Sequence, residues 1–431
     1  MNTPLLERYR QAYRDFDLFP LLTPEEIQKF RIDYGEQTLA RLEQAIDDGP
    51  ENGKIVFAGH RGCGKSTLLF RFSKQMQQEL NYFVIFFSIS DMVEMSAVDH
   101  INILYSIVIQ LLSRASKRQI PIPQNLQKTA LNWKNTDRTE TVEKSIGGEM
   151  GLGADLQFVQ AKLKSEASFR EEITKTFERR ISDLVKLVED INHYIQVHTQ
   201  QKVLVIIDDL DKLDLKLVEE VYRNNINALF QPKIRVVFTI PIAAIRDIEL
   251  RTILNAAAGS PIQPLEVMKF WSRDDRHNPD AKPNEDKVNL FLEMLYRRLD
   301  RDLIEPEVAR QMVLKSGGVM RELVRIARAC CSQCSLRLRK DKERTDLRIN
   351  AEILEAAFVE LRNEFALSLG TSRYEILATT HRDGEPEEVN DPEFLLLLHG
   401  LYVLEYRNGD VWYALHPLVE DLLRRKELIP A

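Results

Sequence analysis

The sequence predicts an α/β fold: a three-layer parallel sheet, followed by a helical region and a small C-terminal domain. Over the first 270 residues, short apolar runs typical of buried strands alternate with segments of helical spacing. This alternation is the pattern of a parallel sheet covered by helices on both faces. From residue 284 the apolar spacing is helical, until two β-prone runs appear near residues 401–415.

Length and composition set the broad class of the protein. The chain has 431 residues, enough for two or three domains, with 44% apolar and 29% charged residues. A net charge of −7 gives no global basic field that would attract nucleic acid. The first residues lack the apolar core of a signal peptide, and no apolar run approaches the ~20 residues of a membrane helix. We therefore expect a cytoplasmic protein without a membrane partner, in which Cys331 and Cys334 are reduced thiols on a helix.

The strongest motif is Gly59–Thr67, which reads G-x-x-x-x-G-K-[ST] between an apolar strand at 54–59 and a helix over 65–80. Its glycines allow the backbone to fold tightly, so that N–H groups surround a phosphate. We expect Lys65 to reach the β- and γ-phosphates of ATP, and the Ser66 hydroxyl to bind Mg²⁺. The predicted nucleotide-binding residues are Gly59, His60, Arg61, Gly62, Cys63, Gly64, Lys65, Ser66 and Thr67. No side-chain chemistry is assigned to the variable positions, His60, Arg61 and Cys63.

A second motif follows the apolar run 203–207, which ends in Asp208 and Asp209. Parallel sheets place ligands at the carboxyl ends of their strands. We expect Asp208 to hold Mg²⁺, directly or through water. Asp209 is expected to orient or deprotonate the attacking water. Asp211 and Asp214 are interpreted as helix caps.

The remaining strands and the first helices complete the predicted core. Residues 1–50 form an N-terminal helical segment, in which Thr23 caps a helix beginning at Pro24. The core spans 51–270, with further strands at 82–89, 234–241 and 262–267. Residues 118–200 form a charged helical insertion that contains a Gly-rich stretch at 147–153. Such an insertion is compatible with a lid, an oligomer contact or a sensor surface.

The C-terminal part is predicted as two further regions. A helical lid covers 284–368, where Gly317 or Gly318 ends one helix and allows the next to begin. A small domain covers 370–431: helices, a hairpin turning at Asn408-Gly409, and a final helix from Pro417. Helices followed by a hairpin resemble a winged helix.

With these motifs in place, the chain resembles the AAA+ and STAND branch of P-loop ATPases, in the origin-recognition-like layout of core, lid and winged helix. The resemblance implies that Thr239 is a sensor-1 residue facing the γ-phosphate and that Arg321 is the sensor-2 arginine of the lid. It also implies that Arg246 or Arg251 is an arginine finger completing a neighbour's site. Asp209 stands where many such proteins have Glu, so slow hydrolysis is expected.

Two functions follow from this resemblance. The first is a switch or scaffold that hydrolyses ATP. Such a protein would form a homo-oligomer or bind an effector partner, and it would act in bacterial defence or signalling. The alternative is a DNA-binding ATPase of the initiator, loader or transposition-regulator type. Basic residues over 321–348 favour the alternative, whereas the hairpin offers only Arg407 to a phosphate backbone. A nucleotide-binding regulator that does not hydrolyse ATP is a third interpretation, if Asp209 is not catalytic.

Overall fold

The computed structural model describes residues 4–131, 152–275, 278, 280–341, 343–407 and 409–430. Within them the chain forms two compact units. The sheet unit comprises Gln37–Ala58 and Leu68–Pro264, and the helical unit comprises Met1–Glu36, Gly59–Thr67 and Leu265–Ala431. Residues 147–151 of the predicted Gly-rich stretch and Asn408 of the predicted turn lie outside the described residues.

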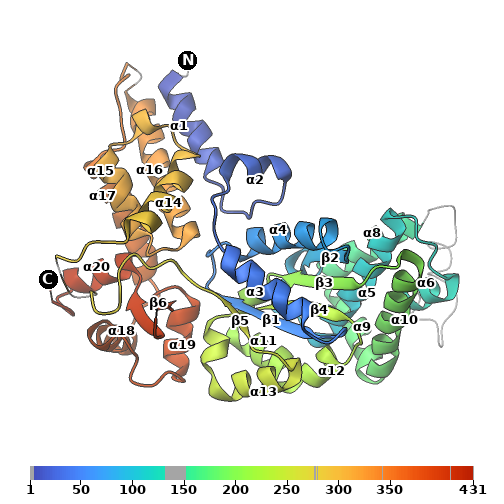
Figure 1. Ribbon diagram of the computed structural model, residues 1–431. Helices are drawn as coiled ribbons and strands as arrows, with labels where there is room; N and C mark the ends of the chain where they lie inside the picture. Colours follow the sequence, from blue (N-terminus) through green and yellow to red (C-terminus); the bar gives the residue numbers. More distant parts are fainter. Residues whose placement is uncertain are drawn as a thin grey trace. The chain divides into compact units, whose positions relative to one another are not determined.

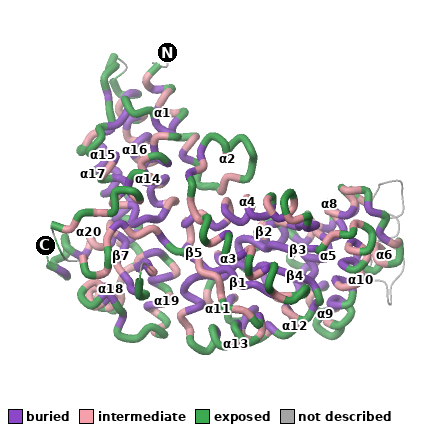
Figure 2. Tube along the Cα trace, in the orientation of Figure 1, coloured by how far each residue is buried: buried purple, intermediate pink, exposed green. Residues whose placement is uncertain are grey.

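The sheet unit is built on a parallel five-stranded sheet in the order β2-β3-β4-β1-β5 (Figure 1). Its strands are β1 (Lys54–Gly59), β2 (Phe83–Ser88), β3 (Val203–Asp208), β4 (Arg235–Pro241) and β5 (Gln263–Leu265). The register places Ser88 beside Asp208 and Ile207 beside Phe238. Every residue of β1, β3 and β4 is buried, as Figure 2 shows along these strands. The predicted α/β fold is therefore confirmed.

Helices lie on both sides of this sheet (Figure 1). They are α3 (Glu36–Asp47), α4 (Lys65–Gln78), α5 (His100–Lys117), α6 (Gln124–Leu131), α8 (Leu152–Ser165), α9 (Ala167–Glu178), α10 (Ile181–Thr199), α11 (Leu215–Glu219), α12 (Ile226–Phe230) and α13 (Ile248–Ala258). The described part of the predicted insertion is helical, and its last helix, α10, packs against α5 before the chain enters β3. α5 is buried on most of its surface because it lies between β2 and α8–α10.

The helical unit contains α1 (Pro4–Asp15), α2 (Pro24–Phe30), α14 (Glu285–Tyr296), α15 (Pro306–Lys315), α16 (Met320–Lys340) and α17 (Ala351–Ala366). Thr23 caps α2 as predicted, in a capping box with Glu26. α1 packs along α16, where the Tyr9 hydroxyl donates to the carbonyl oxygens of Leu303 and Leu347. All four cysteines of the chain are buried and carry thiols that are not joined in disulfides.

The chain ends in a C-terminal module that belongs to the helical unit. It consists of α18 (Thr371–Asp383), α19 (Pro392–His399), β6 (Val403–Tyr406), β7 (Trp412–Leu415) and α20 (Pro417–Arg425). β6 and β7 pair antiparallel, so the predicted hairpin is present. Its assignment as a winged helix stays a prediction. None of the helices in the described residues has both the length and the apolar character needed to cross a bilayer.

Candidate nucleotide site

The phosphate-loop motif has the backbone that its glycines allow. Gly62 and Gly64 adopt φ values of +78° and +89°, which L side chains rarely reach. Lys65 is buried, and its Nζ donates to the carbonyl oxygens of Gly59 (3.0 Å) and His60 (2.6 Å). The ammonium group is thus held inside the loop, where a phosphate would replace these carbonyl contacts.

Two other segments of the helical unit contact the loop backbone. The Tyr34 hydroxyl, just before α3, donates to the carbonyl oxygen of Cys63 at 2.7 Å. The backbone N–H of Arg321 donates to the carbonyl oxygen of Gly62 at 3.0 Å. A Cβ added at Gly62 would lie 2.5 Å from Cβ of Arg321, which belongs to the first turn of α16. Position 62 of the loop therefore requires glycine. The loop is therefore shaped by α16 as well as by its own glycines.

The variable positions of the loop contact the C-terminal module. The His60 ring is buried, and its Nε2 accepts a hydrogen bond from the backbone N–H of Glu405 on β6 at 2.9 Å. The Arg61 guanidinium lies 2.8 Å from Nε2 of His399, at the end of α19. Sequence reasoning gave these side chains no role, because no spacing pattern connects positions 60 and 61 with residues more than 330 positions away.

A buried ion cluster joins α16 to the C-terminal module. Glu322 of α16 is 1% exposed and accepts from Arg325 at 2.9 Å, while Nε2 of the buried His416 lies 3.4 Å from it. Burial alone would raise the pKa of Glu322, but His416 and Arg325 outweigh it and lower the pKa from 4.5 to about 2. The carboxylate therefore stays charged in the folded protein at neutral pH.

We expect Glu322→Gln to lower the free energy of unfolding by about 3 kcal/mol at pH 7, because it leaves the buried His416 and the half-buried Arg325 without a carboxylate. The pKa of Glu322 is lower in the folded protein than in the unfolded chain. Its contribution to the free energy of unfolding is therefore complete above pH 4.5 and is lost as the pH falls toward 2. Urea unfolding at pH 7 and pH 3.5 measures both effects. Glu364→Gln, which removes an exposed partner of Arg325, is the control and should cost less than 1 kcal/mol. Equal losses in the two variants would contradict this account.

In the sheet unit, three buried carboxylates gather at the end of β3. Asp208, Asp209 and Asp211 are 3%, 6% and 3% exposed, and each offers an oxygen within 4.8 Å of the others. Carboxylates packed this closely repel one another when ionised, and hard cations such as Mg²⁺ take oxygen ligands of this kind. The donor set therefore fits a divalent cation. The interpretation of Asp211 as a helix cap was wrong, because it lies within a 3₁₀ turn, Leu210–Lys212; Asp214 does cap α11.

Asp209 is held in an uncommon conformation. Its φ is +69°, a left-handed value that Asp tolerates better than most residues. Its Oδ2 accepts from the hydroxyls of Ser88 (2.6 Å) and Ser90 (3.0 Å), and its Oδ1 lies 2.6 Å from Nζ of Lys212. Burial would raise the pKa of Asp209, but the hydrogen bonds from Lys212 and Ser88 lower it overall. A carboxylate with a lowered pKa is better suited to orienting a water than to removing its proton.

Thr239 lies at the end of β4 and is fully buried. Its hydroxyl donates to the carbonyl oxygen of Ile207 (3.2 Å) and accepts from the N–H of Leu210 (3.0 Å). These bonds fix the turn that carries Asp209, so the structure places Thr239 among the acidic residues. Its role as a sensor of the γ-phosphate stays a prediction.

The predicted arginines occupy three different environments. Arg321 is half-buried, and within the described residues its guanidinium forms no hydrogen bond or ion pair. Arg251 is exposed on α13, and Arg246 is half-buried in the preceding 3₁₀ turn. Arg321 is thus the predicted arginine that lies beside the phosphate loop, whereas a role in trans for Arg246 or Arg251 stays a prediction.

Comparison with known proteins supports the assignment of the core. Residues 39–240 match the sequence profile of the KAP family P-loop domain. No curated protein matches the chain. Together with the sheet, the profile match identifies the core as a P-loop NTPase fold, which is a nucleotide-binding fold.

Solved structures also match the chain, at low sequence identity and with TM-scores below 0.5. A Walker-type ATPase of Pyrococcus abyssi is 17% identical, with 95% of this chain and 99% of that chain covered and a TM-score of 0.43. Cdc6p from Pyrobaculum aerophilum is 12% identical, with 96% of this chain and 98% of that chain covered and a TM-score of 0.41. The Orc1 protein of Aeropyrum pernix, in complex with DNA, is 12% identical, with 94% of this chain and 96% of that chain covered and a TM-score of 0.41.

Proposed function

We propose that this protein is an ATP-binding and ATP-hydrolysing switch of the AAA+ and STAND type, in which the nucleotide state controls the C-terminal module. The observation that carries the proposal is the contact of His60 and Arg61 with Glu405 and His399. Both side chains project from the loop that the motif assigns to phosphate binding. A nucleotide that rearranges this loop therefore changes the contacts that hold the module.

In this proposal each predicted residue keeps a distinct task. The loop amides and Lys65 bind the phosphates, and Arg321 joins the γ-phosphate from the first turn of α16. Ser66 and Asp208 are the proposed ligands of Mg²⁺, which would neutralise charge on the transferred phosphoryl group. Asp209 orients the water, held in place by Ser88 and Lys212. Thr239 supports the turn on which Asp209 lies.

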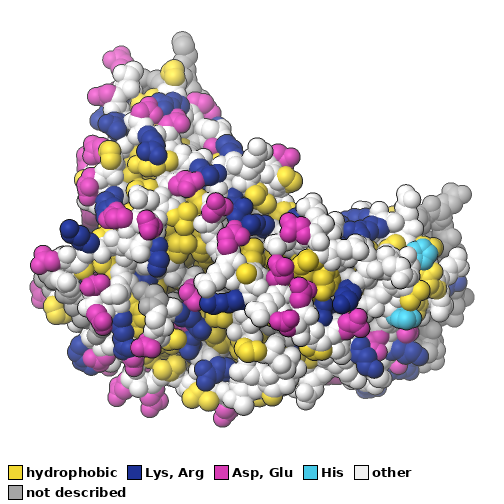
Figure 3. Space-filling model, in the orientation of Figure 1, with side chains coloured by type: hydrophobic (Ala, Val, Ile, Leu, Met, Phe, Trp, Pro, Cys, Tyr) yellow, Lys and Arg dark blue, Asp and Glu magenta, His cyan; other side chains and the backbone are white. Residues whose placement is uncertain are grey.

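DNA binding is the second candidate, and the charge distribution disfavours it. Of the basic residues over 321–348 that favoured DNA, Arg325 pairs with Glu322 and Glu364, and Arg337 pairs with Glu352. Arg407, the only base that the hairpin offers, pairs with Glu405. Basic and acidic side chains are intermixed on the face shown in Figure 3. A DNA-binding surface would instead gather unpaired Lys and Arg along one face.

The experiment that separates the two candidates is ATP turnover by the purified protein at increasing protein concentration, with and without duplex DNA. A switch with sites shared between copies predicts turnover per protein that rises with concentration and is unaffected by DNA. Turnover that requires DNA and falls steeply with salt would replace the switch by the DNA-binding ATPase. No turnover with intact ATP binding would favour the regulator that does not hydrolyse ATP.

A further inference from the structure

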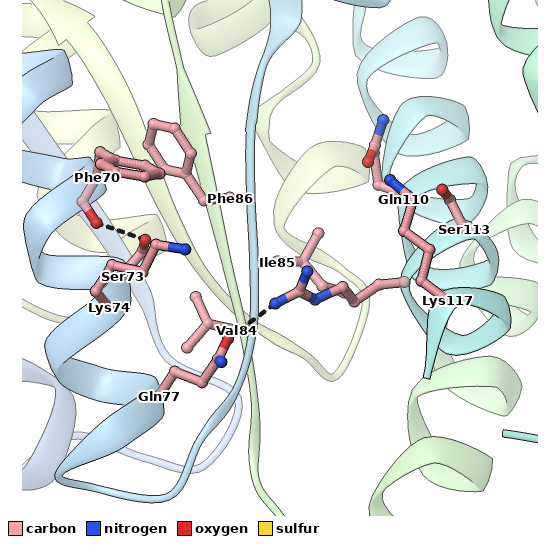
Figure 4. A pocket seen from close by; sticks show the side chains of 11 residues that line it. Phe70, Ser73, Lys74, Gln77, Val84, Ile85, Phe86, Gln110, Ser113 and Lys117 are labelled. Carbon is pink, nitrogen blue, oxygen red and sulfur yellow. Dashed lines mark hydrogen bonds between the residues drawn. The ribbon is translucent and has the colours of Figure 1, made fainter. Parts of the chain in front are cut away.

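A basic cavity lies in the sheet unit, beside strand β2 and between helices α4 and α5 (Figure 4). Its cations are Lys74 from α4 and Arg114 and Lys117 from α5. None of the described residues that line it is acidic; the others are Phe70, Ser73, Gln77, Val84, Ile85, Phe86, Gln110 and Ser113. The proposed nucleotide site uses none of these residues, so the cavity needs its own explanation.

The cavity opens on the edge of the sheet. β2 is the last strand in the order, so only β3 pairs with it. The N–H of Phe83 donates to the carbonyl oxygen of Lys202, the residue before β3. The parallel pairing of β2 with β3 runs on from Phe83 to Ser88. Because backbone groups alternate in direction along a strand, the N–H and C=O groups of Val84 and Phe86 face away from β3. Within the described residues these outward groups form no hydrogen bond.

Within the part of the chain that the structure describes, Lys74, Arg114 and Lys117 form no ion pair with an acidic side chain. The Arg114 guanidinium donates to the neutral amide oxygen of Gln77 at 2.8 Å, and the Lys74 ammonium lies 4.9 Å above the Phe70 ring. Arg118, the residue that follows the last residue of α5, has a pKa lowered first by burial and then by the charge of Arg114. Arginine binds a carboxylate more strongly than a neutral amide. An incoming carboxylate would therefore displace Gln77 from Arg114.

We propose that the edge of β2 binds an extended acidic segment of a partner protein, which adds a strand to the sheet. The unpaired backbone groups of Val84 and Phe86 explain why the partner is an extended chain. Lys74, Arg114 and Lys117 explain why its side chains are acidic. A nucleic-acid phosphate would satisfy the cations but would leave the strand edge unpaired.

A fluorescein-labelled octapeptide of alternating Glu and Val is the probe, and its binding is measured by fluorescence polarisation. Lys74→Glu combined with Lys117→Glu should weaken binding at least tenfold, because both side chains are exposed and lie at the cavity. Lys128→Glu, on an exposed lysine of α6, is the matched control and should bind as the wild type does. ATP binding should be unchanged in all three proteins, which separates this test from that of the switch.

Backbone N-methylation of the peptide tests strand addition. Methylating every second amide on one edge should weaken binding tenfold or more, while methylating the opposite edge should leave it unchanged. Hydrogen exchange at Val84 and Phe86 should slow when the peptide binds. The proposal is overturned if the peptide fails to bind at millimolar concentration, if the charge-reversed protein binds it equally, or if both methylated isomers bind like the parent.

Discussion

Lys65→Ala should lower ATP turnover about 10²–10³-fold, because it removes a cation aimed at the transferred phosphoryl group. It should also weaken ATP binding, since the ammonium group that the loop holds at Gly59 and His60 can no longer bind phosphate. Titration with a fluorescent ATP analogue measures the affinity, and phosphate release measures the turnover.

The matched control for this prediction is Lys54→Met. Lys54 is also a buried lysine, and its Nζ donates to backbone carbonyls at Asn52, Pro232 and Ile234 rather than lying in the loop. This variant should lose stability and keep ATP affinity. If Lys65→Ala binds ATP as tightly as the wild type does, Gly59–Thr67 is not the nucleotide site.

Asp209→Asn should lower turnover about 10²–10³-fold and leave ATP affinity within about twofold of the wild-type value. Asn tolerates the left-handed φ of +69° that Asp209 adopts, so the turn should persist. The neutral amide, however, offers a single acceptor oxygen and no charge to orient a water. Single-turnover kinetics at saturating ATP separate the chemical step from binding.

Asp214→Asn provides the comparison for Asp209→Asn, because Asn caps a helix as well as Asp does and Asp214 lies outside the carboxylate cluster. Its turnover should equal that of the wild type. Unchanged hydrolysis by Asp209→Asn would exclude Asp209 from the reaction and would leave Asp211 as the next candidate in the same cluster.

The sequence was sufficient for the sheet, because burial on both faces requires continuous apolar strands such as 203–207. Helices α14–α17 were predictable for a similar reason: their apolar spacing is regular, and Gly317 and Gly318 adopt the positive φ values that separate α15 from α16. The role of these helices as a lid stays a prediction. The position of Asp208 and Asp209 at the end of β3 was predictable because a polar pair interrupts the apolar pattern there.

Side-chain partners distant in sequence could not be predicted. The contact of His60 with Glu405 uses a backbone N–H, which any residue except proline supplies. Asp211 was mistaken for a cap because an Asp shortly before a helix fits both roles, and only the fold brings its carboxylate beside Asp208. The cations around β2 come from two helices, and their spacing along the chain shows no motif.

Hydrogen exchange at the N–H of Glu405, with and without a non-hydrolysable ATP analogue and Mg²⁺, tests the central claim most directly. In the free protein this N–H donates to His60 of the phosphate loop. We expect exchange to accelerate at least tenfold when the analogue binds, as the loop rearranges and the C-terminal module is released. Saturating binding of the analogue with unchanged exchange at Glu405 would contradict the coupling on which the switch depends.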